Sequence, residues 1–212
     1  MGKKRLAVFA SGRGSNFQVI NDHIKNGFIP AEIGLLITHK TDAGAIEIAS
    51  QNNIKVRIFV PKEFDDSISY NDAILQALQS EEIDFIILAG YLKMIGPQIV
   101  SAYANRIMNI HPALLPSFGG KGMYGHHVHD AVFNHGVKIS GATVHLVNDE
   151  YDAGPIVMQK CISIAGLSSP AEIAGAVLRI EHEIYPQAVK LLVEEKISLN
   201  GRRVEFTGER VD

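Results

Sequence analysis

The stretch LAVFASGRGSN, residues 6–16, decides the fold that we expect for this chain. Its first five residues form a continuous apolar run, which is typical of a strand buried on both faces of a parallel sheet. The segment SGRGSN follows, and Phe17, Ile20 and Ile24 are then spaced for one face of a helix. A strand, a glycine loop and a helix in this order present backbone N–H groups and a positive helix end to a phosphate. An ordinary turn with a helix cap explains the same residues, and Phe17 replaces the third glycine of the dinucleotide-binding fingerprint.

Apolar runs alternate with helical patterns along the rest of the chain. We expect strands at residues 33–38, 55–60, 83–89, 107–111, 139–147 and 156–164, and helices at 43–52, 64–80, 97–103 and from 170 onward. The run IDFIILA, residues 83–89, is the most apolar and is predicted to be central. Pro186 should kink or break the last helix, and the charged tail, residues 197–212, suggests a small hairpin.

This βα rhythm predicts a single doubly wound, mostly parallel α/β sheet with helices on both faces and right-handed crossovers. With no repeat or linker in the sequence, residues 1–212 are expected to form one domain. The segments SGRGSN and NIHP both follow predicted strands, so they should meet at the rim where such sheets bind ligands.

Composition excludes several classes of protein. Of 212 residues, 46% are hydrophobic and 20% charged, an ordinary globular balance, and the net charge of −3 gives no support to a nucleic-acid surface. The single cysteine, Cys161, cannot form an intrachain disulfide, which favours a reducing cytoplasm. No run approaches the ~20 apolar residues that a membrane helix needs, so we expect a soluble, cytoplasmic protein without a membrane partner.

The polar residues concentrate in NIHPALLP, residues 109–116, and GATVHLVNDEYDAGP, residues 141–155. In a strand, Asn109 and His111 point to the same side and Ile110 faces the core. An amide and an imidazole at a strand end suit a carbonyl whose oxygen becomes an oxyanion, and Asp152 is the third partner that we expect. A histidine satisfied by ordinary hydrogen bonds and an aspartate that opens a turn remain the alternatives.

These segments, with ILAGYLKMIGP and EHEIYP, resemble the formyltransferases that use 10-formyltetrahydrofolate, over residues 5–192 and in the same order. The resemblance is greatest to the group that formylates glycinamide ribonucleotide. It implies transfer of the formyl group of 10-formyltetrahydrofolate to the primary amine of 5′-phosphoribosylglycinamide in de novo purine biosynthesis, by direct amine attack through a tetrahedral intermediate. It also implies a cis peptide before Pro116 and a monomer or homodimer.

The resemblance also implies roles for individual residues. The catalytic residues are Asn109, His111 and Asp152, and the nucleotide-binding residues are Gly14, Ser15, Asn16 and Glu181, the first three at the phosphate. The folate-binding residues are Leu92, Lys93, Met94, Ile95, Asn109, Val147, Asn148, Asp149 and Asp152. We expect Asp152 to favour the imidazolium form of His111 and to accept the amine's proton, directly or through water.

The sequence departs from the family pattern at two places, and a group of histidines suggests a metal site instead. Ser67 stands where some members carry a ligand-binding arginine, and the loop at residues 117–125 is rich in glycine, as a mobile lid would be. His126, His127, His129 and His135 suggest zinc, but no cysteine or H-E-x-x-H pattern accompanies them, so we expect no metal. His145, in a predicted strand, has either a supporting polar role near the site or a purely structural one.

Three other functions remain open. A methionyl-tRNA formyltransferase would need a C-terminal RNA-binding domain and a formyltetrahydrofolate hydrolase an extra N-terminal domain, and we expect neither here. A non-catalytic binding module would not need Asn109, His111 and Asp152.

Overall fold

The structure, a computed structural model, describes residues 2–207. Its main sheet has seven strands in the order β3-β2-β1-β4-β5-β6-β7. They are β1 (Lys4–Phe9), β2 (Ala31–Thr38), β3 (Val56–Ile58), β4 (Phe85–Leu88), β5 (Ile107–His111), β6 (Ile139–Leu146) and β7 (Ile156–Ser163). The pairs β1–β2, β1–β4 and β2–β3 are parallel, whereas β6–β7 is antiparallel. The predicted mostly parallel sheet is therefore confirmed, with the most apolar strand, β4, at its centre.

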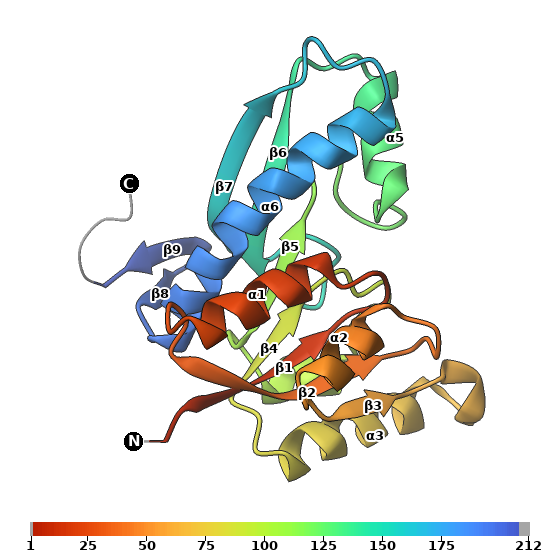
Figure 1. Cartoon of the computed structure of the whole chain (residues 1–212), viewed down its shortest axis with the longest axis vertical. Helices are drawn as coiled ribbons and strands as arrows, with labels where there is room; N and C mark the ends of the chain where they lie inside the picture. The colour runs from red at the N-terminus through yellow and green to blue at the C-terminus, as the bar shows by residue number, and fades with distance from the viewer. Residues whose placement is uncertain (1, 208–212) are drawn as a thin grey trace. The chain divides into compact units, whose positions relative to one another are not determined.

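The chain divides into two compact units, Met1–Met108 and Asn109–Asp212. The helices of the first are α1 (Ser15–Lys25), α2 (Ala45–Gln51), the 3₁₀-helix η1 (Pro61–Glu63), α3 (Ser67–Ser80) and α4 (Pro97–Ala102). The core strands of this unit are buried on both faces: residues 6–9 of β1 and all of β4 are apolar and buried. α1 packs on α2 and β2 (Figure 1), and α3 packs on α4.

The second unit contains α5 (His126–Asn134), α6 (Pro170–Val193) and a hairpin of β8 (Ile197–Asn200) and β9 (Arg203–Phe206). α6 packs along β6, β7 and α5 (Figure 1). The expectation that Pro186 could break this helix is wrong, because α6 includes it without interruption. Pro186 is buried with the apolar face of α6, and packing of that face holds the helix together where one backbone hydrogen bond is missing.

Other boundaries differ from the predicted ones because of local hydrogen bonds. The helix expected from residue 64 begins at Ser67, since Asp66 caps it: the Ser69 N–H donates to Asp66 Oδ1 at 2.7 Å. The preceding residues form η1, and β3 is shorter than expected. The predicted tail hairpin is confirmed for β8 and β9, while residues 208–212 lie outside the described part.

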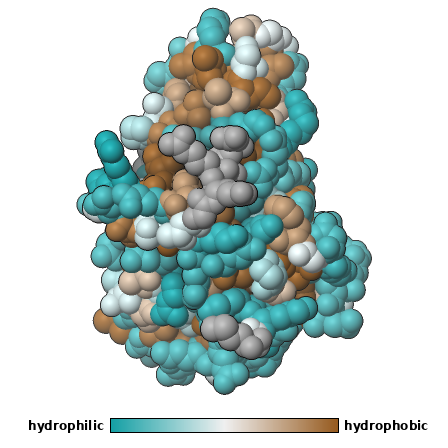
Figure 2. Space-filling view, turned by 90° about the vertical axis from the view of Figure 1, so that its left-hand side faces the viewer, coloured by the Kyte–Doolittle hydropathy of each residue, from teal (hydrophilic) through white to brown (hydrophobic). Residues whose placement is uncertain are grey.

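Hydrophilic residues cover most of the face drawn in Figure 2, and apolar residues appear there in smaller patches. Among residues 2–207, no helix combines the length and the apolar character that crossing a membrane requires.

Candidate active site

The glycine loop leads directly into α1, as the sequence predicts. Gly14 is the N-cap residue, with φ of 82°, and no side chain caps the helix. A Cβ on Gly14 would lie 2.9 Å from Ile48 Cδ1 and 3.0 Å from Ala45 Cα, so both the backbone conformation and the space require glycine. The uncapped start of α1 at Ser15 is therefore a suitable end for an anion to approach.

Ser11 joins the loops that follow three strands of the first unit, a role that sequence reasoning missed. Its side chain is 2% exposed, and its N–H donates to the Gly90 carbonyl at 3.1 Å. Its Oγ accepts the Leu92 N–H at 3.2 Å and lies 3.0 Å from His39 Nδ1. The signal available in the sequence was a small hydroxyl residue at the end of an apolar run.

The loop after β4 carries the four residues expected to line a folate pocket. Leu92, Lys93 and Met94 are exposed, whereas Ile95 is buried. Leu92 and Met94 are large apolar side chains with 40% and 45% of their surface open to solvent, as the wall of a ligand pocket would be before the ligand binds. Ile95 anchors the loop in the core.

β5 positions Asn109 and His111, and the structure brings both to Asp152. His111 Nδ1 lies 3.6 Å from Asp152 Oδ2, and Ile110 between the two polar residues is buried. Asn109 reaches the same group through His145: Asn109 Nδ2 is 3.0 Å from His145 Nε2, which is 3.7 Å from Asp152 Oδ1. The three residues predicted from sequence, Asn109, His111 and Asp152, thus belong to one polar group, with His145 as its fourth member.

The hydrogen bonds of His145 define the orientation of the Asn109 amide. Its Nδ1 lies 2.9 Å from the Leu146 carbonyl, which can only accept, so Nδ1 carries the proton. In the neutral ring Nε2 is then an acceptor, and the Asn109 amide nitrogen donates one of its two hydrogens to it. The other N–H of Asn109 remains to be offered to a ligand.

The glycine-rich segment after the cis Leu115–Pro116 peptide contacts both His111 and Asp152. The His111 Nε2–H donates to the Phe118 carbonyl at 2.8 Å, and the Gly120 N–H donates to Asp152 Oδ2 at 2.9 Å. Residues 118 and 120 of the loop that sequence reasoning expected to be a mobile lid therefore contact the predicted catalytic group directly.

Burial has the largest effect on the pKa of His111. It lowers the pKa of the imidazole below its ordinary value, while the Asp152 carboxylate and the Phe118 carbonyl raise it and His145 lowers it further. Asp152 has the expected effect on His111, but burial is larger and the net shift is downward.

The pKa of Asp152 is also lowered. Burial alone would raise it, but His145, the charge of His111 and the Gly120 N–H together favour the carboxylate more strongly. An ionised carboxylate beside an imidazole that loses its proton readily is suited to moving a proton.

The loop between β6 and β7 contains Asp152 and the other residues of this segment that are expected to bind the folate. Val147 and Asn148 are half-buried, Asp149 is exposed, and Asn148 Oδ1 accepts the Glu150 N–H at 3.2 Å. A Cβ on Gly154 would lie 1.7 Å from the Leu146 carbonyl oxygen, so only glycine fits this turn.

The last predicted ligand residue, Glu181, lies on α6 and is 9% exposed, so its side chain is buried and does not face solvent. Charged side chains are rarely buried, so the burial of Glu181 makes it a stronger candidate for a specific role than the sequence pattern suggested.

The fold and this polar group define a class of protein. The profile described as formyl transferase matches residues 4–189, and the chain belongs to that family. The chain is 44% identical over 197 residues to the chloroplastic phosphoribosylglycinamide formyltransferase of Arabidopsis thaliana, covering 92% of this chain and 67% of that protein.

Two bacterial proteins match over nearly their whole length. The phosphoribosylglycinamide formyltransferase of Bacillus subtilis (strain 168) is 38% identical over 199 residues, covering 94% of this chain and 97% of that protein. The crystal structure of glycinamide ribonucleotide transformylase 1 from Symbiobacterium toebii superposes with a TM-score of 0.92 at 32% identity, covering 97% and 95% of the two chains.

Proposed function

We propose that this chain transfers the formyl group of 10-formyltetrahydrofolate to the primary amine of 5′-phosphoribosylglycinamide in de novo purine biosynthesis. The activity follows from the family and from the relatives named phosphoribosylglycinamide formyltransferase, whose similarity covers 92–94% of this chain. The observation that supports the assigned chemistry best is the gathering of Asn109, His111 and Asp152 around one buried polar centre.

The mechanism needs no protein nucleophile. The substrate amine attacks the formyl carbon, the C=O electrons move to oxygen, and a tetrahedral carbon with an oxyanion forms. The free N–H of Asn109 and a ring N–H of His111 stabilise that oxyanion. His111 Nε2–H donates to the Phe118 carbonyl, so the formyl oxygen must replace that carbonyl as its acceptor.

Asp152 moves the proton. As the N–C bond forms, the amine's proton passes to the carboxylate, directly or through a water. When the bond from the formyl carbon to N10 breaks, the proton is delivered to N10, the oxyanion collapses to the product amide, and tetrahydrofolate leaves. Asp152 is ionised at neutral pH, since its pKa lies below the ordinary aspartate value, so its carboxylate can accept the proton.

The binding roles belong to the same proposal. Gly14, Ser15 and Asn16 hold the ribose phosphate at the start of α1, and Glu181 contacts the nucleotide. Leu92, Lys93, Met94 and Ile95, with Asn109 and the residues Val147, Asn148, Asp149 and Asp152, bind the folate. It stays a prediction that residues 1–212 act as one catalytic domain, as a monomer or homodimer in the cytoplasm. It also stays a prediction that the segments SGRGSN and NIHP meet at one rim of the sheet.

One assay tests the function. Purified protein is incubated with 10-formyltetrahydrofolate with and without glycinamide ribonucleotide, and formylated nucleotide, tetrahydrofolate and formate are measured. We expect formylated nucleotide and tetrahydrofolate in equal amounts, and no formate without acceptor. Formate release without acceptor would favour the hydrolase, and folate binding without turnover would favour a non-catalytic module.

A further inference from the structure

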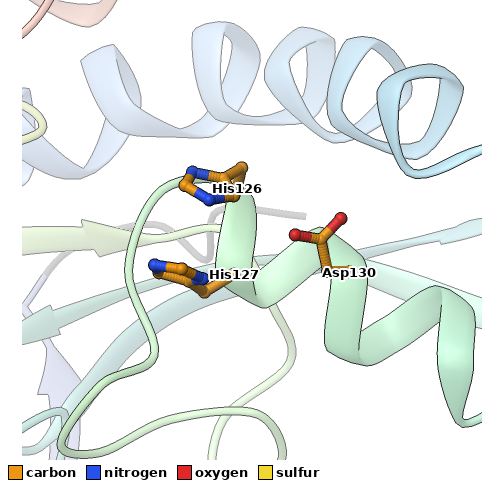
Figure 3. Close-up of side chains that lie close together, drawn as sticks. All are labelled: His126, His127 and Asp130. Atoms are coloured by element: carbon orange, nitrogen blue, oxygen red, sulfur yellow. The ribbon is translucent and has the colours of Figure 1, made fainter.

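Two histidines and an aspartate gather on the first turn of α5. His126 and His127 are its first two residues, and Asp130 lies one turn further. One ligand atom from each of the three lies within 4.8 Å of the other two, and the centroids of the two imidazole rings are 4.0 Å apart (Figure 3). The arrangement follows from helix geometry, since residues three and four apart share a face. His129 is buried on another face of α5 and His135 follows its last residue, so only two of the four histidines in this stretch take part.

We propose that His126, His127 and Asp130 form a surface site for a divalent transition-metal ion, with zinc as its probe. Two imidazoles and one carboxylate are the ligand types that zinc accepts at three positions, leaving one for water. Tetrahedral zinc, with bonds of about 2.0–2.2 Å, holds its ligands roughly 3.3 Å apart. The side chains must therefore close by roughly 1.5 Å from the largest separation, 4.8 Å, and the two exposed histidines can do so by rotating.

The ligand set also determines which metal ions the site would not bind. Magnesium and calcium prefer oxygen ligands, of which this cluster offers one side chain, whereas imidazole suits zinc, copper and nickel. The positive end of α5 opposes a cation, but its partial charge is smaller than the full negative charge of Asp130.

A metal ion at this position would affect the glycine-rich loop that precedes α5. His126 follows Gly125 immediately, at the end of the glycine-rich loop whose residues 118 and 120 contact His111 and Asp152. A metal that joins His126 to Asp130 links the first turn of α5 across a four-residue spacing, which removes part of the cost of starting a helix. The ion would therefore order the end of this loop without entering the reaction.

Zinc titration by calorimetry tests the site, on untagged protein in which the exposed Cys161 is replaced by Ser so that its thiol cannot bind the metal. We expect one zinc per chain and no heat from magnesium. His126→Ala, His127→Ala and Asp130→Asn should each weaken binding by at least ~10-fold, because loss of even an outer-shell partner costs about that much. The matched control is His135→Ala, which removes an exposed histidine beside the same helix and should bind as the parent does.

Cobalt provides an independent readout, because four-coordinate Co²⁺ bound by protein ligands absorbs visible light much more strongly than the hydrated ion. We expect the absorption in the parent and in His135→Ala, and its loss in the His126→Ala/His127→Ala double variant. Far-UV circular dichroism of each variant checks that α5 still forms. Folded variants of His126 and His127 that bind zinc like the parent, or an equal loss in His135→Ala, would overturn the proposal.

Discussion

At the scale of single residues, the site depends on hydrogen-bond donors held in place by other side chains. Asn109 has two N–H hydrogens, and His145 takes one of them. His111 is held from both sides, by the Phe118 carbonyl and by Asp152. The Asn109 amide is therefore oriented before a substrate arrives, whereas in the proposed mechanism the His111 N–H must exchange the Phe118 carbonyl for the formyl oxygen.

We expect Asn109→Ala and His111→Ala to reduce kcat by about 100- to 1000-fold, the usual loss when one oxyanion donor is removed, ~3–4 kcal/mol. Nucleotide affinity should stay close to that of the parent, since neither residue is assigned to the phosphate. Single-turnover kinetics measures the first quantity and calorimetry with glycinamide ribonucleotide the second. Near-normal turnover in either variant would remove that residue from the mechanism.

Asp152→Asn should lower the pKa of His111 further, because the carboxylate charge that raises it is lost while burial remains. Imidazole NMR titration of His111 measures the shift. Asp149→Asn is the control: it removes an exposed carboxylate from the same loop and should leave His111 unchanged. An unchanged or higher pKa in Asp152→Asn would show that the carboxylate does not act on this imidazole.

At the scale of elements, a buried threonine of β6 holds the turn that follows β5. Thr143 is inaccessible to solvent, and its hydroxyl donates to the Ala113 carbonyl at 2.7 Å and accepts the Leu115 N–H at 3.0 Å. Gln159 of β7 adds bonds of 2.9 Å to both Thr143 Oγ1 and the Leu115 carbonyl. The turn is therefore held by β6 and β7.

Thr143→Val keeps the shape of the side chain but leaves the Leu115 N–H and the Ala113 carbonyl without their partner. We expect the free energy of unfolding to fall by about 1–3 kcal/mol, the cost of leaving a buried polar group unsatisfied. Urea unfolding measures it.

The matched control for Thr143→Val lies on the same strand. Ser140 is also buried, but its hydroxyl has no hydrogen-bond partner in the described part of the chain, so Ser140→Ala should be neutral or stabilising. Equal losses in the two variants would mean that the hydrogen bonds of Thr143 contribute nothing beyond burial of a hydroxyl.

At the scale of the whole molecule, buried histidines make stability depend on pH. Burial lowers the pKa of His39, His111, His129 and His182 below 6.5 in the folded state. Below the unfolded value of 6.5, the unfolded chain binds protons that the folded chain does not, so acidification favours unfolding. We expect the urea midpoint to fall steadily between about pH 7 and pH 5. A midpoint that is constant or rises on acidification would contradict the direction of these shifts.

The boundary between the two compact units falls inside a strand. β5 spans Ile107–His111, and the division lies between Met108 and Asn109. A strand cannot keep its hydrogen bonds if half of it unfolds, so we expect a single calorimetric transition with equal calorimetric and van't Hoff enthalpies. Two resolved transitions would contradict the prediction that residues 1–212 are one domain.

Much of the fold could be predicted from local patterns in the sequence. The apolar runs that became β1 and β4 are recognisable because strands buried on both faces tolerate few polar residues, and the strand predicted at residues 107–111 matches β5 completely. The boundaries that were missed, at α3 and β3, depend on a cap and on pairing with a neighbour, which a hydrophobic pattern does not encode.

By itself the sequence determined the alternation of strands and helices, the central strand, and the candidates Asn109, His111 and Asp152, because periodicity and residue type are local properties. Only the tertiary structure decided that His145 orients Asn109, that Phe118 and Gly120 hold His111 and Asp152, and that Ser11 joins three loops. Most of these partners lie 28 to 81 residues apart in the sequence, so the folding of the backbone brings them within hydrogen-bonding distance. The tertiary structure also decided the direction in which the pKa of His111 shifts, because burial depends on everything that surrounds the ring.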